Sequence, residues 1–204
     1  MKKLALYTTM FISVATSALA AQNHDADKKW MLRTRALAVI PQEDGLVSNG
    51  QGVKIDNSIV PEFDLSYFFT PNIAAEVIAA ITPHDVKTTG GIDAGSSWLL
   101  PPTLTLQYHF NECPWGVMPY VGAGINYTHF FNADGGALNQ VKYDDSFGAA
   151  FQAGMDIPLK DSWYLNFDIK KVYINTTAKF SPSGVRANVD IDPLLIGVGI
   201  GYKF

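Results

Sequence analysis

The sequence predicts an all-β protein, an eight-stranded antiparallel transmembrane β-barrel. Three observations predict it. Apolar and polar side chains alternate in segments of about ten residues, the length of a tilted membrane-spanning strand. The connections between these segments are long and polar at one end of the strands and short at the other. Large aromatic rings gather at the end with the short connections, as rings do at a membrane boundary.

Each predicted strand carries apolar residues at every second position, so that one face is apolar and the other is mixed. In order, the predicted strands are 30–40, 63–69, 73–81, 104–110, 121–127, 147–157, 163–169 and 194–204. The last one, within PLLIGVGIGYKF, has an apolar face that no later segment covers. Lipid would cover that face, and the sheet would have to close on itself, because unpaired backbone groups are costly in hydrocarbon.

The connections and the aromatic rings favour a membrane barrel over a soluble sandwich or a lipocalin-like barrel, which would also show alternation. Segments 41–60, 83–100, 131–145 and 176–190 are long and polar, whereas those near 70–72, 111–118 and 158–161 are short. A soluble barrel has no reason to collect rings on its outer face at one height. The rings at the short-turn end are Trp30, Tyr67, Phe69, Tyr108, Phe110, Trp163, Tyr202 and Phe204.

Residues 1–20 are predicted to be a Sec-type signal peptide. Lys2 and Lys3 precede a short apolar stretch, and Ala18-Leu19-Ala20 offers a cleavage site near Ala20 or Ala21. Residues 21–204 are then expected to form a single barrel domain in the outer membrane of a Gram-negative cell. The net charge of −4 argues against nucleic acid as a partner.

Several blocks of the sequence resemble the OmpW family of small outer-membrane proteins. They are LPPTLTLQYHF (100–110), PYVGAGINYTHFF (119–131), SFGAAFQAGMDIPL (146–159), NTTAKF (175–180) and IDPLLIGVGIGYKF (191–204). The resemblance implies an eight-stranded barrel that passes small hydrophobic molecules across the outer membrane, with a sideways exit into lipid, in a family that includes an alkane-uptake protein. It also implies that Tyr202 and Phe204 are a signal for the outer-membrane assembly machinery.

Three groups of residues are assigned to the barrel wall and lumen, the first two because they alternate with the apolar face of their strands and the third because it lies at strand ends near the long connections. Buried charges must be paired, so a network is expected to plug the lower barrel: Arg33, Arg35, Glu62, Asp64, Glu76, Asp156, Asp168 and Lys170. Small residues are expected either to leave a lumen sector open for a solute or to help the barrel coil: Gly122, Gly124, Gly148, Gly154, Gly197, Gly199 and Gly201. Prolines mark the expected lateral exit, where wall hydrogen bonds are missing: Pro61, Pro101, Pro102 and Pro193.

The predicted function is therefore passage of small hydrophobic molecules, and the alternative is a structural or receptor-type barrel whose extracellular loops bind a partner without transport. Catalysis is not predicted, because no serine lies in a Gly-x-Ser-x-Gly elbow and His84-Asp85 begins an ordinary polar loop. The other histidines lack the spacing of metal ligands, so no metal or cofactor is predicted. The expected partners are outer-membrane lipid, small hydrophobic solutes and the assembly machinery.

Overall fold

The computed structural model describes residues 27–42, 44–47, 53–88, 93–110, 113, 116–134, 140–181 and 186–204. The predicted signal peptide, residues 1–20, lies outside these described residues. A search of the described residues for a helix long and apolar enough to cross a bilayer finds none.

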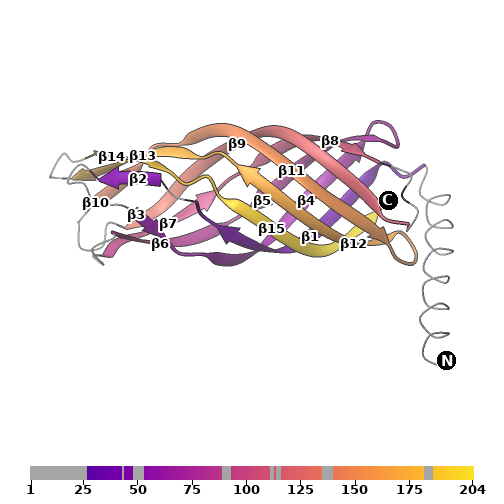
Figure 1. The fold of residues 1–204 in the computed structure, drawn as a ribbon, viewed down its shortest axis with the longest axis horizontal. Helices are drawn as coiled ribbons and strands as arrows, with labels where there is room; N and C mark the ends of the chain where they lie inside the picture. Colours follow the sequence, from indigo (N-terminus) through magenta and orange to yellow (C-terminus); the bar gives the residue numbers. More distant parts are fainter. Residues whose placement is uncertain are drawn as a thin grey trace, which may run out of the picture.

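Eight antiparallel strands close into a barrel, as the sequence predicts. Each strand pairs with its neighbour around the barrel, and β15 pairs with β1 to complete the circle, for example at Leu32↔Tyr202 (Figure 1). In order around the barrel, the strands are β1 (Trp30–Ile40), β4 (Ser58–Phe68), β5 (Ile73–Ala80), β8 (Thr103–His109), β9 (Met118–Asp134), β11 (Ser146–Pro158), β12 (Trp163–Val172) and β15 (Leu194–Lys203).

The alternation in β1 shows why these segments form barrel strands. Arg33 and Arg35 are buried inside the barrel, whereas Leu32, the residue before Arg33, is 49% exposed on the outside. Large apolar side chains are exposed on the outer face of every barrel strand. Polar groups inside and apolar groups outside reverse the order of a soluble protein, which is the arrangement that lipid favours.

Aromatic rings surround the end of the barrel where the short turns lie, as predicted; we call this the turn end. Trp30 packs on Tyr67 with ring centroids 4.7 Å apart, and Trp163 packs on Tyr202 at 5.0 Å. Trp30 and Phe204 also exchange main-chain hydrogen bonds of 3.0 and 2.8 Å, so β1 begins where the chain ends. This exposed layer of rings marks one boundary of the membrane-spanning part.

At the opposite end, which we call the extension end, the segments expected to be polar loops largely form strands. They contain β2 (Asp44–Val47), β3 (Val53–Ile55), β6 (Thr82–Thr88), β7 (Asp93–Leu100), β10 (Gln140–Tyr143), β13 (Asn175–Ser181) and β14 (Arg186–Asp190). The pairing order β10-β13-β14-β2 makes a separate small sheet, and these strands lie away from the carboxyl terminus (Figure 1). Each of these runs has three to eight residues, so its alternation is too brief to identify from the sequence.

Candidate functional site: the barrel interior

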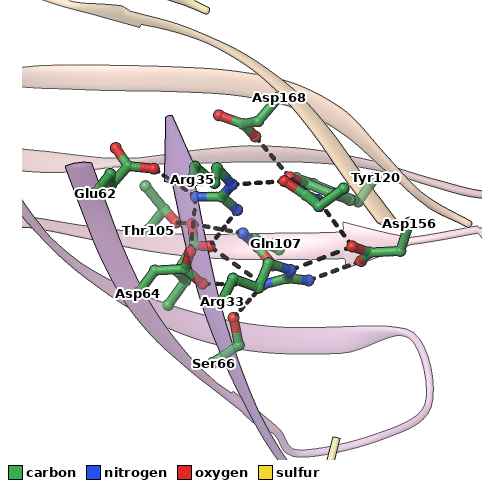
Figure 2. Close-up of polar contacts among 12 residues, drawn as sticks. Arg33, Arg35, Glu62, Asp64, Ser66, Thr105, Gln107, Tyr120, Asp156 and Asp168 are labelled. Atoms are coloured by element: carbon green, nitrogen blue, oxygen red, sulfur yellow. Dashed lines mark hydrogen bonds and ion pairs between the residues drawn. The ribbon is translucent and has the colours of Figure 1, made fainter. Parts of the chain in front are cut away.

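Arg33 projects from β1 into the centre of the barrel, where it is fully buried. Its Nη2 lies 2.7 Å from Asp156 Oδ2, and its Nη1 lies 3.2 Å from Asp64 Oδ1 and 3.3 Å from Glu76 Oε1. The same Nη1 donates a hydrogen bond of 2.8 Å to Ser66 Oγ. One guanidinium therefore connects β1, β4, β5 and β11 across the lumen (Figure 2).

Arg35 lies two residues further along the same inward face. Its Nη1 lies 2.6 Å from Glu62 Oε1 and 2.7 Å from Asp64 Oδ2. Its Nη2 lies 3.3 Å from Glu76 Oε1, and its Nε donates to Asn166 Oδ1 at 2.5 Å. Asp64 and Glu76 each contact both guanidinium groups, so the two arginines act as one cationic centre.

Lys170 on β12 is a further buried cation. Its Nζ donates to Glu62 Oε1 at 2.8 Å and lies 2.8 Å from Asp168 Oδ1, in an ion pair that is not aligned as a hydrogen bond. Tyr120 Oη donates to the other oxygen of Asp168 at 2.6 Å. The structure thus brings together, each at most 2% exposed, all residues expected in the charge network: Arg33, Arg35, Glu62, Asp64, Glu76, Asp156, Asp168 and Lys170.

Neutral polar side chains that the sequence analysis did not single out complete this network. Gln107 and Gln152 donate through Nε2 to Glu76 Oε2 at 2.7 and 2.9 Å. Asn166 donates through Nδ2 to Asp156 Oδ1 at 2.8 Å. These donors are needed because the carboxylates outnumber the cations, and buried acceptors require partners. Their inward parity is the signal that could have identified them.

A layer of apolar and aromatic side chains fills the interior between the charge network and the turn end. The buried cluster consists of Met31, Phe68, Ala74 and Tyr164, with Met118 packed against it. His109 joins this layer to the network, because its ring lies 4.9 Å from that of Phe68 and 4.9 Å from that of Tyr120. The network and this layer together fill the part of the barrel between its middle and the turn end, which we call the lower barrel. They close this part to a solute.

On the extension side of the network, the interior holds a small apolar cavity of about 40 Å³. Leu37 and Val39, which follow Arg35 on the inward face of β1, form part of its wall, and Glu62 and Lys170 form its floor. The rest of the lining is mostly aliphatic: Ile78, Ala80, Thr82, Leu99, Pro101, Thr103, Val172, Ile174, Ile191, Pro193 and Leu195. A cavity that holds benzene has roughly 150 Å³, so a molecule of that size would fit here only if the walls moved apart.

The wall beside this cavity is interrupted between β4 and β6, and we call this interruption the β4–β6 seam. β4 pairs with β5 as far as Glu62↔Ala80. The next pairing on this side, among the described residues, joins β3 to β6 and begins at Ile55↔Val86. Residues 56–61 and 81–85 therefore face each other without a ladder.

Pro61 accounts for the start of the seam. The N–H of Phe69 donates to the carbonyl of Ile73 on β5, so the backbone groups of every second β4 residue back to position 61 point the same way. A proline there has no N–H to donate to the neighbouring strand. Ile59 and Ile81, which flank the seam, are 80% and 49% exposed on the outer face. The outer surface beside the seam is therefore apolar.

The prolines expected at a lateral exit lie at different places. Pro101 and Pro193 line the cavity, whereas Pro61 and Pro102 are exposed on the outer face. The carbonyls of Pro102 and Pro193 accept main-chain hydrogen bonds of 3.1 and 3.3 Å from neighbouring strands. These two prolines leave their part of the wall bonded, and Pro61 lies at the interruption.

The prediction that glycines leave a lumen sector open is wrong. A Cβ atom at Gly124 would overlap the carbonyl oxygen of Leu104, and one at Gly199 would overlap that of Thr34. Glycine is required at both positions because the neighbouring backbone approaches too closely for a side chain. A Cβ atom at Gly148 would likewise overlap the carbonyl oxygen of Tyr173, and side chains fill the space over the remaining glycines: Gln152 over Gly122, Tyr120 over Gly154, Arg35 over Gly197 and Arg33 over Gly201.

The remaining predicted residues lie outside this interior. Tyr202 and Phe204 stack on the outer surface at the turn end with centroids 6.3 Å apart, and their recognition by the assembly machinery stays a prediction. Within the described ranges, no group of three or more His, Cys, Asp or Glu residues is arranged to hold a metal ion.

Comparison with known proteins assigns this chain to a family. The model of the OmpW family matches residues 27–204. The chain is 35% identical to outer membrane protein W of Vibrio cholerae serotype O1, with 95% of each chain covered. It is 32% identical to the dibenzothiophene metabolism operon protein PahQ of Pseudomonas aeruginosa, with 78% of this chain and 77% of that protein covered.

Solved structures show the same architecture. The outer membrane protein OprG of Pseudomonas aeruginosa superposes with a TM-score of 0.77 at 27% identity, covering 87% of this chain and 96% of OprG. The outer membrane protein AlkL, determined in lipid bilayers, gives a TM-score of 0.70 at 27% identity, covering 87% of this chain and 90% of AlkL. The chain belongs to the OmpW family and is an outer-membrane β-barrel.

Proposed function

We propose that this protein lets small apolar molecules cross the outer membrane by entering the aliphatic cavity and leaving sideways into the lipid. The observation that carries the proposal is the position of the cavity, on a closed floor and beside an interrupted wall. Its lining is aliphatic apart from Glu62, Lys170, Thr82 and Thr103. Apolar lining with few polar groups suits an apolar ligand and gives a polar one little to bind.

The floor and the seam differ in what it costs to open them. Passage through the floor would separate Arg33 and Arg35 from their carboxylates, at about 3–5 kcal/mol for each buried charge left uncompensated. Moving β4 and β6 apart breaks no ladder bond at Pro61, and it exposes apolar side chains to lipid, which solvates them well. The sideways route therefore has the lower barrier.

The comparisons support the choice of solute. The name of the relative PahQ connects that protein with the metabolism of dibenzothiophene, an apolar polycyclic compound. The resemblance to the OmpW family likewise implies hydrophobic solutes, alkanes among them. An aliphatic cavity whose walls must widen suits such molecules, since they need shape and apolar contact rather than specific hydrogen bonds.

Pro61→Val is expected to slow transport. Valine restores an N–H that can donate across the β4–β6 seam, and its branched side chain favours a strand, so the seam should close. We expect slower uptake of a fluorescent polycyclic hydrocarbon into proteoliposomes whose outer leaflet contains lipopolysaccharide, together with unchanged or higher resistance to urea. The matched control is Ala36→Val, because Ala36 lies beside Pro61 on β1 and also points outward. This substitution adds similar bulk without adding a backbone N–H.

Wild-type uptake above that of an unrelated closed barrel supports transport, and equal uptake would favour the receptor-type barrel instead. If Pro61→Val and Ala36→Val both transport at the wild-type rate, the β4–β6 seam is not the exit. If Ala36→Val is as slow as Pro61→Val, added bulk rather than the restored donor explains the effect.

A further inference from the structure

A second interruption of the wall lies at the extension end, between β9 and β10. β9 pairs with β11 as far as Thr128↔Ser146 and then continues beside β7 to Asp134. β10 pairs with β13 on its other side. In the part of the chain that the structure describes, residues 129–134 and 140–143 lie next to each other with no ladder between them. We call this unpaired gap the β9–β10 slot.

The slot contains a hollow of about 490 Å³. His129 and Lys142 line it from the outward faces of their strands, whereas Phe130, Val141 and Tyr143 line it from the inward faces. Side chains of both faces can share one hollow only where the two strands leave the wall open between them. The hollow therefore reaches from the outer surface into the barrel wall.

Two aromatic rings line the hollow on the side of the barrel interior. Phe130 and Tyr143 stack with ring centroids 5.4 Å apart and planes inclined by 25°. Both pack against a buried aliphatic cluster, and part of that cluster lines the cavity, namely Leu99, Val172, Ile174 and Ile191. Apolar side chains thus continue from the slot to the cavity, with the stacked pair between them.

Asp145 stabilises the lower edge of the slot. Its carboxylate accepts hydrogen bonds from Tyr127 Oη at 2.6 Å, from His129 Nδ1 at 2.8 Å and from the backbone N–H of Phe130. The bond from Tyr127 does most to hold the pKa of Asp145 below its usual range, so the carboxylate stays charged at neutral pH. The Asp145 carboxylate thus accepts hydrogen bonds from the edge of β9 at the point where β11 no longer pairs with it. Because this edge already has a partner, the slot can stay open.

The slot lies at the height where lipid meets water. Directly below it, Tyr127 and Phe147 face each other on β9 and β11 and are 47% and 69% exposed on the outer surface. Such rings settle at the headgroup boundary. Outer-membrane barrels have short turns on the periplasmic side and long connections on the outside, so the extension end faces the cell exterior. The hollow therefore opens beside the headgroups of the outer leaflet, where apolar molecules adsorbed from outside first collect.

We propose that the β9–β10 slot is the entrance through which small apolar solutes pass from the outer leaflet into the cavity, with Phe130 and Tyr143 as its gate. The inference rests on the proposed function and adds an entry site to it. It is separate from the β4–β6 seam, because the two interruptions lie between different pairs of strands. Rotation of the two rings would join the hollow to the cavity without breaking backbone pairing.

Blocking the slot with a bulky label tests this entrance. In a Cys113→Ser background, Lys142→Cys places a thiol on the outer rim of the slot, and Asn188→Cys places one on the exposed face of β14. Each variant is measured before and after reaction with a polymer-linked maleimide, with the same hydrocarbon and proteoliposomes as above. We expect labelling to reduce uptake by Lys142→Cys to the rate of protein-free liposomes, and labelling of Asn188→Cys to change nothing.

The gate is tested by Tyr143→Ala, which removes one of the two rings, and Phe147→Ala is the matched control on the lipid side. We expect faster uptake for Tyr143→Ala and the wild-type rate for Phe147→Ala. Labelled Lys142→Cys that transports as fast as before labelling would overturn the entrance while leaving the proposed function standing. A wild-type protein that transports no faster than a closed barrel would overturn both. Unchanged or slower uptake by Tyr143→Ala would overturn the gate.

Discussion

Replacing Arg35 with methionine is expected to lower the free energy of unfolding of the barrel by about 3–5 kcal/mol, because its buried carboxylate partners lose their cation. Arg35 contacts Glu62 and Asp64 at 2.6 and 2.7 Å and Glu76 at 3.3 Å. Methionine keeps much of the volume and removes the charge. The measurement is urea unfolding in lipid vesicles, followed by tryptophan fluorescence.

Lys160→Met is the control for loss of a positive charge. The Lys160 side chain is 90% exposed in the turn between β11 and β12 and lies 3.9 Å from the exposed Asp161, and exposed pairs contribute at most about 1 kcal/mol. Equal unfolding midpoints for Arg35→Met and Lys160→Met would show that water solvates the charge network, and the lower barrel would then not be closed.

Gly124→Leu is expected to prevent or severely weaken closure of the barrel. A Cβ atom at this position would overlap the Leu104 carbonyl oxygen, and the obstacle is backbone, which cannot rotate away as a side chain can. Overpacking usually costs about 1–3 kcal/mol, and a clash with a paired strand belongs at or above the upper end. Heat-modifiable migration on gels and urea unfolding would both report the loss.

Ala123→Leu is the matched control, since Ala123 is the adjacent residue of β9 and points outward. It adds apolar area against lipid and should leave stability unchanged. A Gly124→Leu barrel as stable as Ala123→Leu would mean that β8 and β9 are separated more widely than here, and that the glycine sector has free space after all.

The barrel was predictable because a lipid environment requires apolar side chains at every second position over about ten residues of each strand. In β1, the alternation of Arg33 and Arg35 with Leu32 gives the orientation of the whole strand, and the same parity places Lys170 and Asp168 inside on β12. Pairing between charged side chains on different strands can then be predicted, since a buried charge requires a partner. Which partner it finds depends on register, as in the contact of Arg33 with Asp156 across the barrel.

Pro61 was expected where wall hydrogen bonds are missing, but the cavity and the extent of the wall interruptions could not be predicted, because they depend on relations between strands that the sequence does not express. Pro61 is visible in the sequence, but the seam appears only once β4 is seen to lose its partner after Glu62↔Ala80. Gly124 was misread for the same reason: a missing side chain indicates free space only if no neighbouring backbone occupies it. The stacking of Phe130 on Tyr143 likewise joins two strands, β9 and β10, whose relative position cannot be inferred from the sequence.

Ion conductance, measured together with solute uptake on the same purified protein, tests the central claim most directly. The claim is that the lower barrel is closed and that apolar solutes leave through its side. In planar bilayers we expect no sustained single-channel current, because the charge network and the layer around Phe68 and Tyr164 fill the lumen, while proteoliposomes take up hydrocarbon faster than those with an unrelated closed barrel. A stable ohmic current that persists in Pro61→Val would contradict the account, since it would require an open path straight through the barrel.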